Sequence, residues 1–247
     1  MTQGTTGQFQ KDTLRFGLLG FFATLAGLSL LLNGYLLWVL NQPRVEHVSG
    51  GRTPAPVTAA DHARGPSDAF VTVIVYSDFE CAFCRELHAS LKTLASERRF
   101  RWVLRHYPVT THPNAARYAE ACECAGRQGK FWEFADWLFE ALAPQRVPVQ
   151  EPLPPGAAAP LQRPEELSVV RLVETAHVMG LDASRFRECL ERQQESGRVL
   201  AQKAEGESLA ITATPTFFIN GKRFVGALLP DELRKIVGGD SARQATD

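Results

Sequence analysis

The sequence predicts an α/β domain that follows one apolar N-terminal helix, and three observations support this prediction. Hydrophobic periodicity changes from that of a strand to that of a helix at Cys81 and Cys84. After several helical segments, two short apolar runs flank Asn220-Gly221, which is a typical hairpin turn. Near the N-terminus, residues 16–40 form an apolar run without a charged side chain. These observations place a possible reaction centre at the two cysteines.

The segments on either side of Cys81 and Cys84 explain why these thiols could react. Residues 71–76 are apolar and rich in β-branched side chains, which favours a strand, and residues 85–94 carry leucines at helical spacing. Cys81 is therefore expected at a helix N-terminus, where unpaired N–H groups and the helix dipole stabilise a thiolate. A thiolate attacks disulfides, and Cys84 lies one turn further, close enough to release a mixed disulfide from Cys81. The pattern predicts a redox-active dithiol.

A second motif, TATPTFFING, lies at residues 212–221. Together with residues 70–84, it resembles the DsbA-like thiol-disulfide oxidoreductases of the thioredoxin-fold superfamily. The resemblance covers residues 65–238 and implies a thioredoxin fold with a helical insert at about 112–210. It also implies catalytic Cys81 and Cys84, which form the redox-active disulfide, without a metal or other cofactor. Pro215 matches the family's cis-proline, which would leave the Thr214 peptide groups free to pair with an extended substrate.

The remaining elements of the domain can be predicted from periodicity and from turn residues. A second strand is expected at residues 100–107, and a hairpin of two strands at 216–219 and 223–225. Helices are expected at residues 113–124, 130–142, 165–179, from 182 or 184, at 198–209 and from Pro230 onward, with a C-terminal tail at 239–247. The proline-rich residues 143–164 are expected to form an exposed loop without helix or strand.

Proton transfer at the dithiol cannot follow the pattern common among thioredoxins. Many of them keep a buried acid six residues before the first cysteine, and this chain has Val75 there. Asp78 and Glu80 both flank the dithiol, and proton transfer is assigned to Glu80, with water or another group as alternatives. His88, one turn past Cys84, is expected to be a solvated helix residue.

Three further cysteines complete the five in the chain. Cys122 and Cys124 are two residues apart on one predicted helix and point to different sides, so they are not expected to bridge each other. Some DsbA-like relatives have a structural disulfide whose cysteines resemble Cys124 and Cys189. The alternative is that these are buried free thiols that pack as small apolar side chains.

The N-terminal region is predicted to attach the domain to a membrane. After a short tail at residues 1–15, residues 16–40 are long enough to cross a bilayer, and Tyr35 and Trp38 near their end suit its interface. The run is too long for a cleavable signal peptide, so an uncleaved anchor is expected, followed by a flexible linker at residues 41–64. Flanking charges barely distinguish the two orientations. Because disulfides persist in oxidising compartments, the catalytic domain is placed on the periplasmic side.

These features favour a membrane-tethered, extracytoplasmic oxidoreductase that oxidises cysteine pairs of exported proteins. Its expected partners are protein thiols and a membrane reoxidant similar to DsbB or VKOR, or else an electron donor. The chain has 27 basic and 27 acidic residues, which gives no support for a nucleic-acid partner. Ala82-Phe83 replaces the Pro-His of strong oxidants, so a reductase or isomerase is the alternative. A more distant alternative is a zinc or copper module that uses Cys81, Cys84, Cys122 and Cys124.

Overall fold

The computed structural model describes residues 29, 31–33, 35, 52–146, 161–162 and 166–244. The chain divides into two units, Met1–Pro43 and Arg44–Asp247, and the domain below belongs to the second. Nearly all of the predicted anchor lies outside the described residues, and the few described there are helical. Among the helices that are described, none combines the length and the apolar character that a membrane crossing requires.

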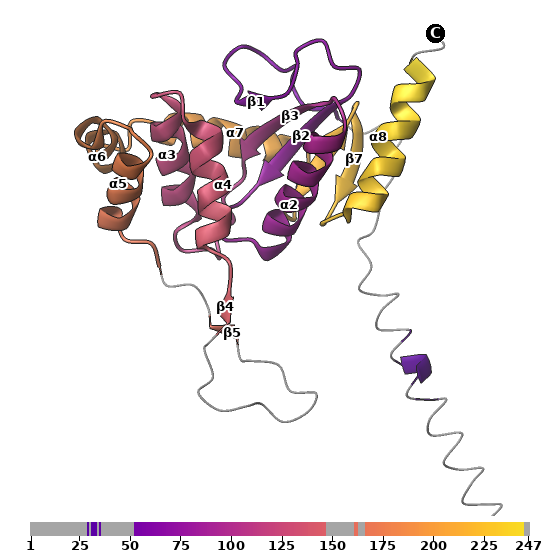
Figure 1. Cartoon of the computed structure of the whole chain (residues 1–247), viewed down its shortest axis with the longest axis horizontal. Coiled ribbons are helices and arrows are strands. Elements are labelled where there is room, and N and C mark those ends of the chain that lie inside the picture. The colour runs from indigo at the N-terminus through magenta and orange to yellow at the C-terminus, as the bar shows by residue number, and fades with distance from the viewer. Residues whose placement is uncertain are drawn as a thin grey trace, which may run out of the picture. The chain divides into compact units, whose positions relative to one another are not determined.

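A five-stranded mixed sheet forms the centre of the domain (Figure 1). Its strand order is β1-β3-β2-β6-β7, in which β2 runs parallel to β3 and antiparallel to β6. The bounds are β1 Ala63–Arg64, β2 Thr72–Ser77, β3 Arg101–His106, β6 Thr216–Ile219 and β7 Lys222–Val225. Asn220 and Gly221 join β6 to β7 with φ values of 48° and 80°, the left-handed backbone that a tight hairpin turn requires.

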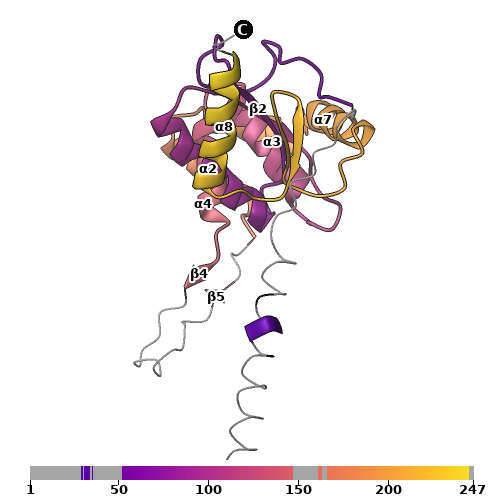
Figure 2. The same cartoon turned by 90° about the vertical axis from the view of Figure 1, so that its right-hand side faces the viewer.

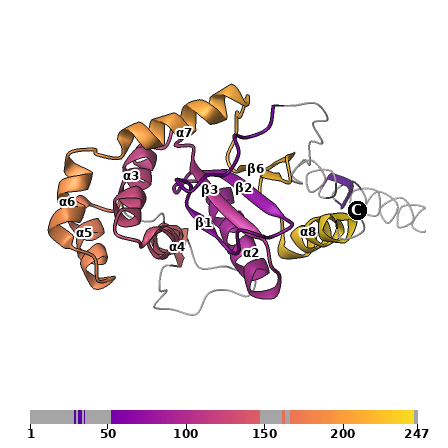
Figure 3. The ribbon, with the colours of Figure 1, turned by 90° about the horizontal axis from the view of Figure 1, so that it is seen from above.

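Both faces of the sheet are buried. Successive side chains of β2 point to opposite sides and so contribute to two different cores. Val73 and Val75 belong to the core beneath α2 (Ala82–Glu97) and α8 (Pro230–Gln244). Ile74 and Tyr76 belong to the core on the other face, which α7 (Ser196–Ser208) borders. Seen from above, α7 lies across the sheet from α2 and α8 (Figure 3), and Figure 2 shows α8 packed beside α2. The result is three layers of helix, sheet and helix.

The other helices are inserted between β3 and β6 and have a core of their own. These helices are α3 Ala115–Gly126, α4 Phe131–Ala141, α5 Val169–Val178 and α6 Ala183–Glu191. The insert core is rich in aromatic side chains, including Phe131, Phe134 and Phe186. It also contains Cys81 and Cys84, so the dithiol lies where the insert meets the sheet domain. The predicted thioredoxin fold with a helical insert is confirmed.

The domain begins earlier than the sequence predicted. The linker was expected to extend to residue 64, but Ala63 and Arg64 form the edge strand β1, which pairs with β3. Further upstream, buried Arg105 binds Asp61 with an Nε–Oδ1 distance of 3.0 Å, and it donates to the Ala55 carbonyl at 3.1 Å. An unpaired buried guanidinium would be costly, so these acceptors hold residues 55–64 against the sheet. The linker prediction was wrong for residues 52–64.

Two smaller predictions also need correction. Helix α8 continues to Gln244, so the helix does not give way to a tail at residue 239. Within the proline-rich region, Gln145–Arg146 (β4) and Leu161–Gln162 (β5) pair as two short antiparallel strands. Strands of two residues need very few backbone N–H donors, so the prolines around them do not prevent this pairing.

Candidate active site

Cys81 is the N-cap of α2, and Cys84 lies in its first turn. Both thiols are free and buried, but Cys81 is 8% exposed and borders a groove, whereas Cys84 is 2% exposed. The pKa of Cys81 is lowered to about 6, and the largest cause is a hydrogen bond from the Cys84 thiol. Burial acts in the opposite direction, whereas hydrogen bonds from the Thr214 side chain and from two backbone N–H groups lower the pKa further. Burial raises the pKa of Cys84 well above its usual value. At neutral pH, Cys81 is therefore the thiolate and Cys84 the thiol.

The loop before β6 faces this dithiol, as the resemblance implied. The Thr214–Pro215 peptide bond is cis. When Cys81 is protonated, its thiol donates a hydrogen bond to the Thr214 carbonyl, with an Sγ–O distance of 3.3 Å. The two motifs are 133 residues apart in the sequence and meet at one sulfur atom. Thr214 is thus placed next to any chain that becomes attached to Cys81.

Asp78 contacts Cys84 through its backbone. Its backbone N–H donates to the Cys84 sulfur at 3.4 Å. The carboxylate is completely buried and accepts hydrogen bonds from the Val109 N–H at 2.7 Å and from His112 Nδ1 at 2.8 Å. The sequence interpretation noted Asp78 and passed over His112. A signal for His112 was available in the sequence. It follows β3, and because β3 runs parallel to β2, both strands end at the edge of the sheet where Asp78 lies.

Glu80, the residue predicted to transfer protons, is held by another part of the protein. Its Oε2 accepts a hydrogen bond from the Asn114 N–H at 2.7 Å, at the N-terminus of α3. A carboxylate is stabilised there by the helix dipole. Glu80 borders the same groove as Cys81. Its proton-transfer role remains a prediction.

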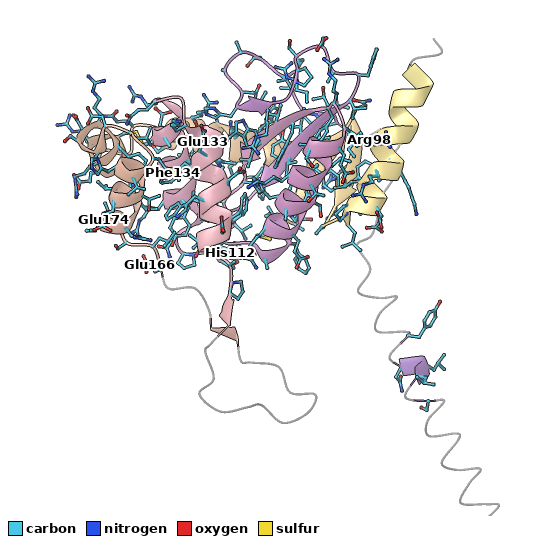
Figure 4. The ribbon with its side chains drawn as sticks, in the orientation of Figure 1. Arg98, His112, Glu133, Phe134, Glu166 and Glu174 are labelled. Atoms are coloured by element: carbon cyan, nitrogen blue, oxygen red, sulfur yellow. A yellow bond between two sulfur atoms is a disulfide. The ribbon has the colours of Figure 1, made fainter. Side chains whose placement is uncertain are left out.

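A groove of about 790 Å³ opens in front of Cys81. One wall is the start of α2, including exposed Phe83, and the other is the loop before α3, including His112. Glu166, which precedes α5, also lines the groove, and Figure 4 labels it with His112 on the same side of the insert. A groove of this size has room for part of an extended peptide at the reactive sulfur.

The second cysteine pair lies away from this groove. Cys124 of α3 and Cys189 of α6 form a disulfide with an S–S distance of 2.01 Å, the pairing that the resemblance implied. Cys122 is a buried free thiol that donates to the Phe131 carbonyl. Because Cys124 is already bonded to sulfur, it is not available to the four-thiolate metal site considered as an alternative.

His88 differs from its expectation as a solvated helix residue. It is buried between Trp102 and Phe139, and its Nε2 lies 2.7 Å from Asp136 Oδ1. Burial lowers the pKa of His88, against the influence of Asp136. Arg64 also binds Asp136, at 3.1 Å, so this cluster joins β1 and α2 to α4. The sequence prediction for His88 was wrong, and the contacts of His88 are structural.

Comparison with known proteins identifies the family. The family model described as Thioredoxin matches residues 57–238. The chain therefore belongs to the thioredoxin family. Its fold resembles BdbD of Bacillus subtilis, with a TM-score of 0.61 and 18% identity over 78% of this chain and 98% of that one. It also resembles a thioredoxin-like oxidoreductase of Silicibacter pomeroyi, with a TM-score of 0.57 and 21% identity over 76% and 94%.

The class of protein follows from the family, the fold and the dithiol. The chain is a member of the thioredoxin family with a CxxC dithiol, and its fold resembles that of alpha-DsbA1 of Wolbachia pipientis. Curated relatives in sequence carry a different name: Na(+)/H(+) antiporter NhaA 3 of Salinispora tropica is 36% identical over 67% of this chain. NhaA 1 of Salinispora arenicola is 37% identical over 68%. This chain covers only 22% of each of these relatives, so it matches a domain-sized part of them.

Proposed function

We propose that this protein oxidises cysteine pairs in exported proteins from a membrane-tethered position. The observation that carries the proposal is the difference between its two thiols. Cys81 borders the groove and has a lowered pKa, whereas Cys84 is buried and has a raised pKa. A sulfur that is stable as a thiolate is also a good leaving group, which favours release of reduced enzyme.

The exchange would proceed in two balanced steps. A substrate thiolate attacks Cys81 of the Cys81–Cys84 disulfide, forms a mixed disulfide and releases Cys84 as a thiolate that takes up a proton. A second substrate thiolate then attacks the substrate sulfur of that mixed disulfide and releases the Cys81 thiolate. The substrate loses two electrons and two protons in total, and the enzyme dithiol gains the electrons.

The proposed location combines the N-terminal apolar run with the second disulfide. Residues 16–40 are long enough for a transmembrane anchor. The Cys124–Cys189 disulfide is of the kind that forms and persists in oxidising compartments, which supports the periplasmic side. Because each cycle leaves a reduced dithiol, the enzyme needs a reoxidant. We assign this role to a membrane redox partner of the DsbB or VKOR kind.

A reductase or isomerase is the second candidate, and the Cys81 pKa is the observation that favours it. The pKa of about 6 lies between values of about 7 in thioredoxin and about 3.5 in DsbA. A smaller stabilisation of the thiolate makes the disulfide a weaker oxidant. In this case the membrane partner would donate electrons.

The reduction potential of the Cys81–Cys84 couple tests the proposal. The full chain is equilibrated with graded ratios of reduced and oxidised glutathione, and free thiols are labelled and counted by mass. A C81S/C84S variant retains the second disulfide and provides the baseline. A potential clearly above thioredoxin's value of about −270 mV, towards DsbA's about −120 mV, is expected for an oxidase. A value at or below that of thioredoxin would overturn the oxidase and favour the reductase.

A further inference from the structure

His112 lies in the loop between β3 and α3 and contacts the two segments that form the dithiol site. Its Nδ1 is 2.8 Å from Oδ2 of Asp78, whose backbone N–H donates to Cys84. The Asp78 carboxylate is fully buried, and the His112 side chain is 31% exposed where it borders the groove. The histidine ring therefore has one nitrogen fixed by a buried anion, while part of the ring is exposed in the groove that Cys81 borders.

The charges around the groove explain what such a ring could do. Three carboxylates belong to the site: Asp78, which is buried and binds His112, and Glu80 and Glu166, which line the groove just before α2 and before α5. Each of them would disfavour a thiolate on Cys81. Against them, the described lining residues supply two cationic groups: Arg85 of α2 and His112 when it is protonated.

The other groups that face the groove are already engaged. Arg85 donates to the Leu142 carbonyl at 3.1 Å, Glu80 accepts from Asn114, and Glu166 pairs with Arg117 at 2.8 Å. The Tyr118 side chain carries no positive charge, and its hydroxyl oxygen accepts a hydrogen bond from the Leu167 N–H. Among these lining residues, His112 is therefore the cation whose orientation is fixed by Asp78, three residues before Cys81.

We propose that His112, oriented by Asp78, is the cation that stabilises the Cys81 thiolate across the groove and so makes the disulfide a better oxidant. This inference rests on the proposed dithiol function. His112 and Asp78 are positioning residues, since they act on the reacting sulfur through charge. The arrangement compensates for the absence of a histidine between the two cysteines.

The titration of His112 agrees with this arrangement. Burial alone would lower the pKa of His112, but the hydrogen bond to Asp78 and the negative charges of Asp78, Cys81 and Glu80 raise it. The negative charge of the Cys81 thiolate favours the protonated form of His112. Because the coupling between two sites is reciprocal, protonated His112 must favour the Cys81 thiolate to the same extent. Since Asp78 accepts the Nδ1 proton, the second proton of the imidazolium is carried by Nε2.

The rate of Cys81 alkylation as a function of pH tests this proposal on the reduced full chain. Iodoacetamide reacts with the thiolate, so the rate reports the Cys81 titration, with an inflection expected at a pH of about 6. His112→Asn keeps a donor for Asp78 but removes the charge. It is expected to raise the inflection by about one pH unit, which means about tenfold less thiolate relative to thiol. At pH 7 its disulfide should be a weaker oxidant of glutathione by about fivefold.

Two matched variants separate charge from structure. His112→Lys restores a positive charge and should return the inflection to near the wild-type value. His177→Asn changes an exposed histidine of α5 outside the groove and should leave the profile unchanged. An inflection in H112N equal to that of the wild type, or a lysine variant that behaves like asparagine, would overturn the inference. If the wild-type dithiol failed to exchange at all, the proposed function itself would be wrong.

Discussion

The two cysteine pairs of this protein have the same chemistry in the oxidised form and very different surroundings. Cys81 and Cys84 are three residues apart at the start of a helix that faces an open groove. Cys124 and Cys189 are 65 residues apart and join two helices within a buried aromatic core. The first site has backbone donors that stabilise a thiolate and room for an attacking sulfur. The second is shielded from an incoming thiolate. Access and thiolate stabilisation thus decide which pair can exchange.

The largest expected effect comes from removing the attacking sulfur. Cys81→Ser should abolish exchange with peptide disulfides, since Cys84 is buried and has a raised pKa. Cys84→Ser should keep the attack but lose the resolving thiol, so mixed disulfides accumulate on Cys81. Non-reducing electrophoresis with mass spectrometry of the adducts measures both results. A Cys84 variant without adducts would show that the two roles have been assigned wrongly.

The difference in resistance to reduction should be the next largest effect. Under increasing concentrations of reduced glutathione, the Cys81–Cys84 disulfide is expected to open, while Cys124–Cys189 stays closed. Structural disulfides commonly have potentials below about −300 mV, beyond the reach of the glutathione pool. Differential labelling of the two pairs, followed by peptide mapping, gives both midpoints. Opening of both pairs at one midpoint would contradict the comparison.

The buried pair should contribute stability without contributing to exchange. The double substitution C124A/C189A is expected to lower the free energy of unfolding by about 2–4 kcal/mol, because it restores freedom to a long loop of the unfolded chain. For a domain of this size, that corresponds to a fall of roughly 5–15 °C in Tm. Calorimetry measures the change, and exchange rates well below the Tm should match those of the wild type. A large loss of exchange there would mean that the second disulfide shapes the active site.

The smallest effect is expected at Cys122, which belongs to neither pair. It is fully buried, and burial raises its pKa well above the usual value, so it should be unreactive. Cys122→Ala removes one sulfur atom and should cost about 1 kcal/mol or less, with unchanged exchange and an intact Cys124–Cys189 disulfide. Peptide mapping that found Cys122 bonded to Cys189 in the wild type would show that the pairing can rearrange.

The N-terminal segment determines how the catalytic domain can be isolated. A fragment from residue 65 would lack β1 and Asp61, and Arg105 would lose one of its buried anionic partners. Glu205 would remain, with its Oε1 2.8 Å from Arg105 Nη1. Fragments that begin before Arg52 keep the contacts that the structure describes for residues 52–64.

The sequence by itself determined the fold class, the dithiol and the order of nearly all elements in the domain. These features depend on local patterns: the change of periodicity at Cys81, the Asn220-Gly221 turn and the resemblance around Pro215. Each pattern is contained in a few neighbouring residues, so it can be read without knowing what packs against it.

Only the tertiary structure decided the partners of the charged side chains. Asp78 with His112, Arg105 with Asp61, and buried His88 are combinations of residues from distant elements. No local pattern distinguishes a buried histidine from a solvated one, because burial depends on elements that are far apart in the chain. The same reason explains why residues 52–64, rich in turn formers, were mistaken for a free linker: their acceptors are needed by an arginine some 40 to 50 residues further on.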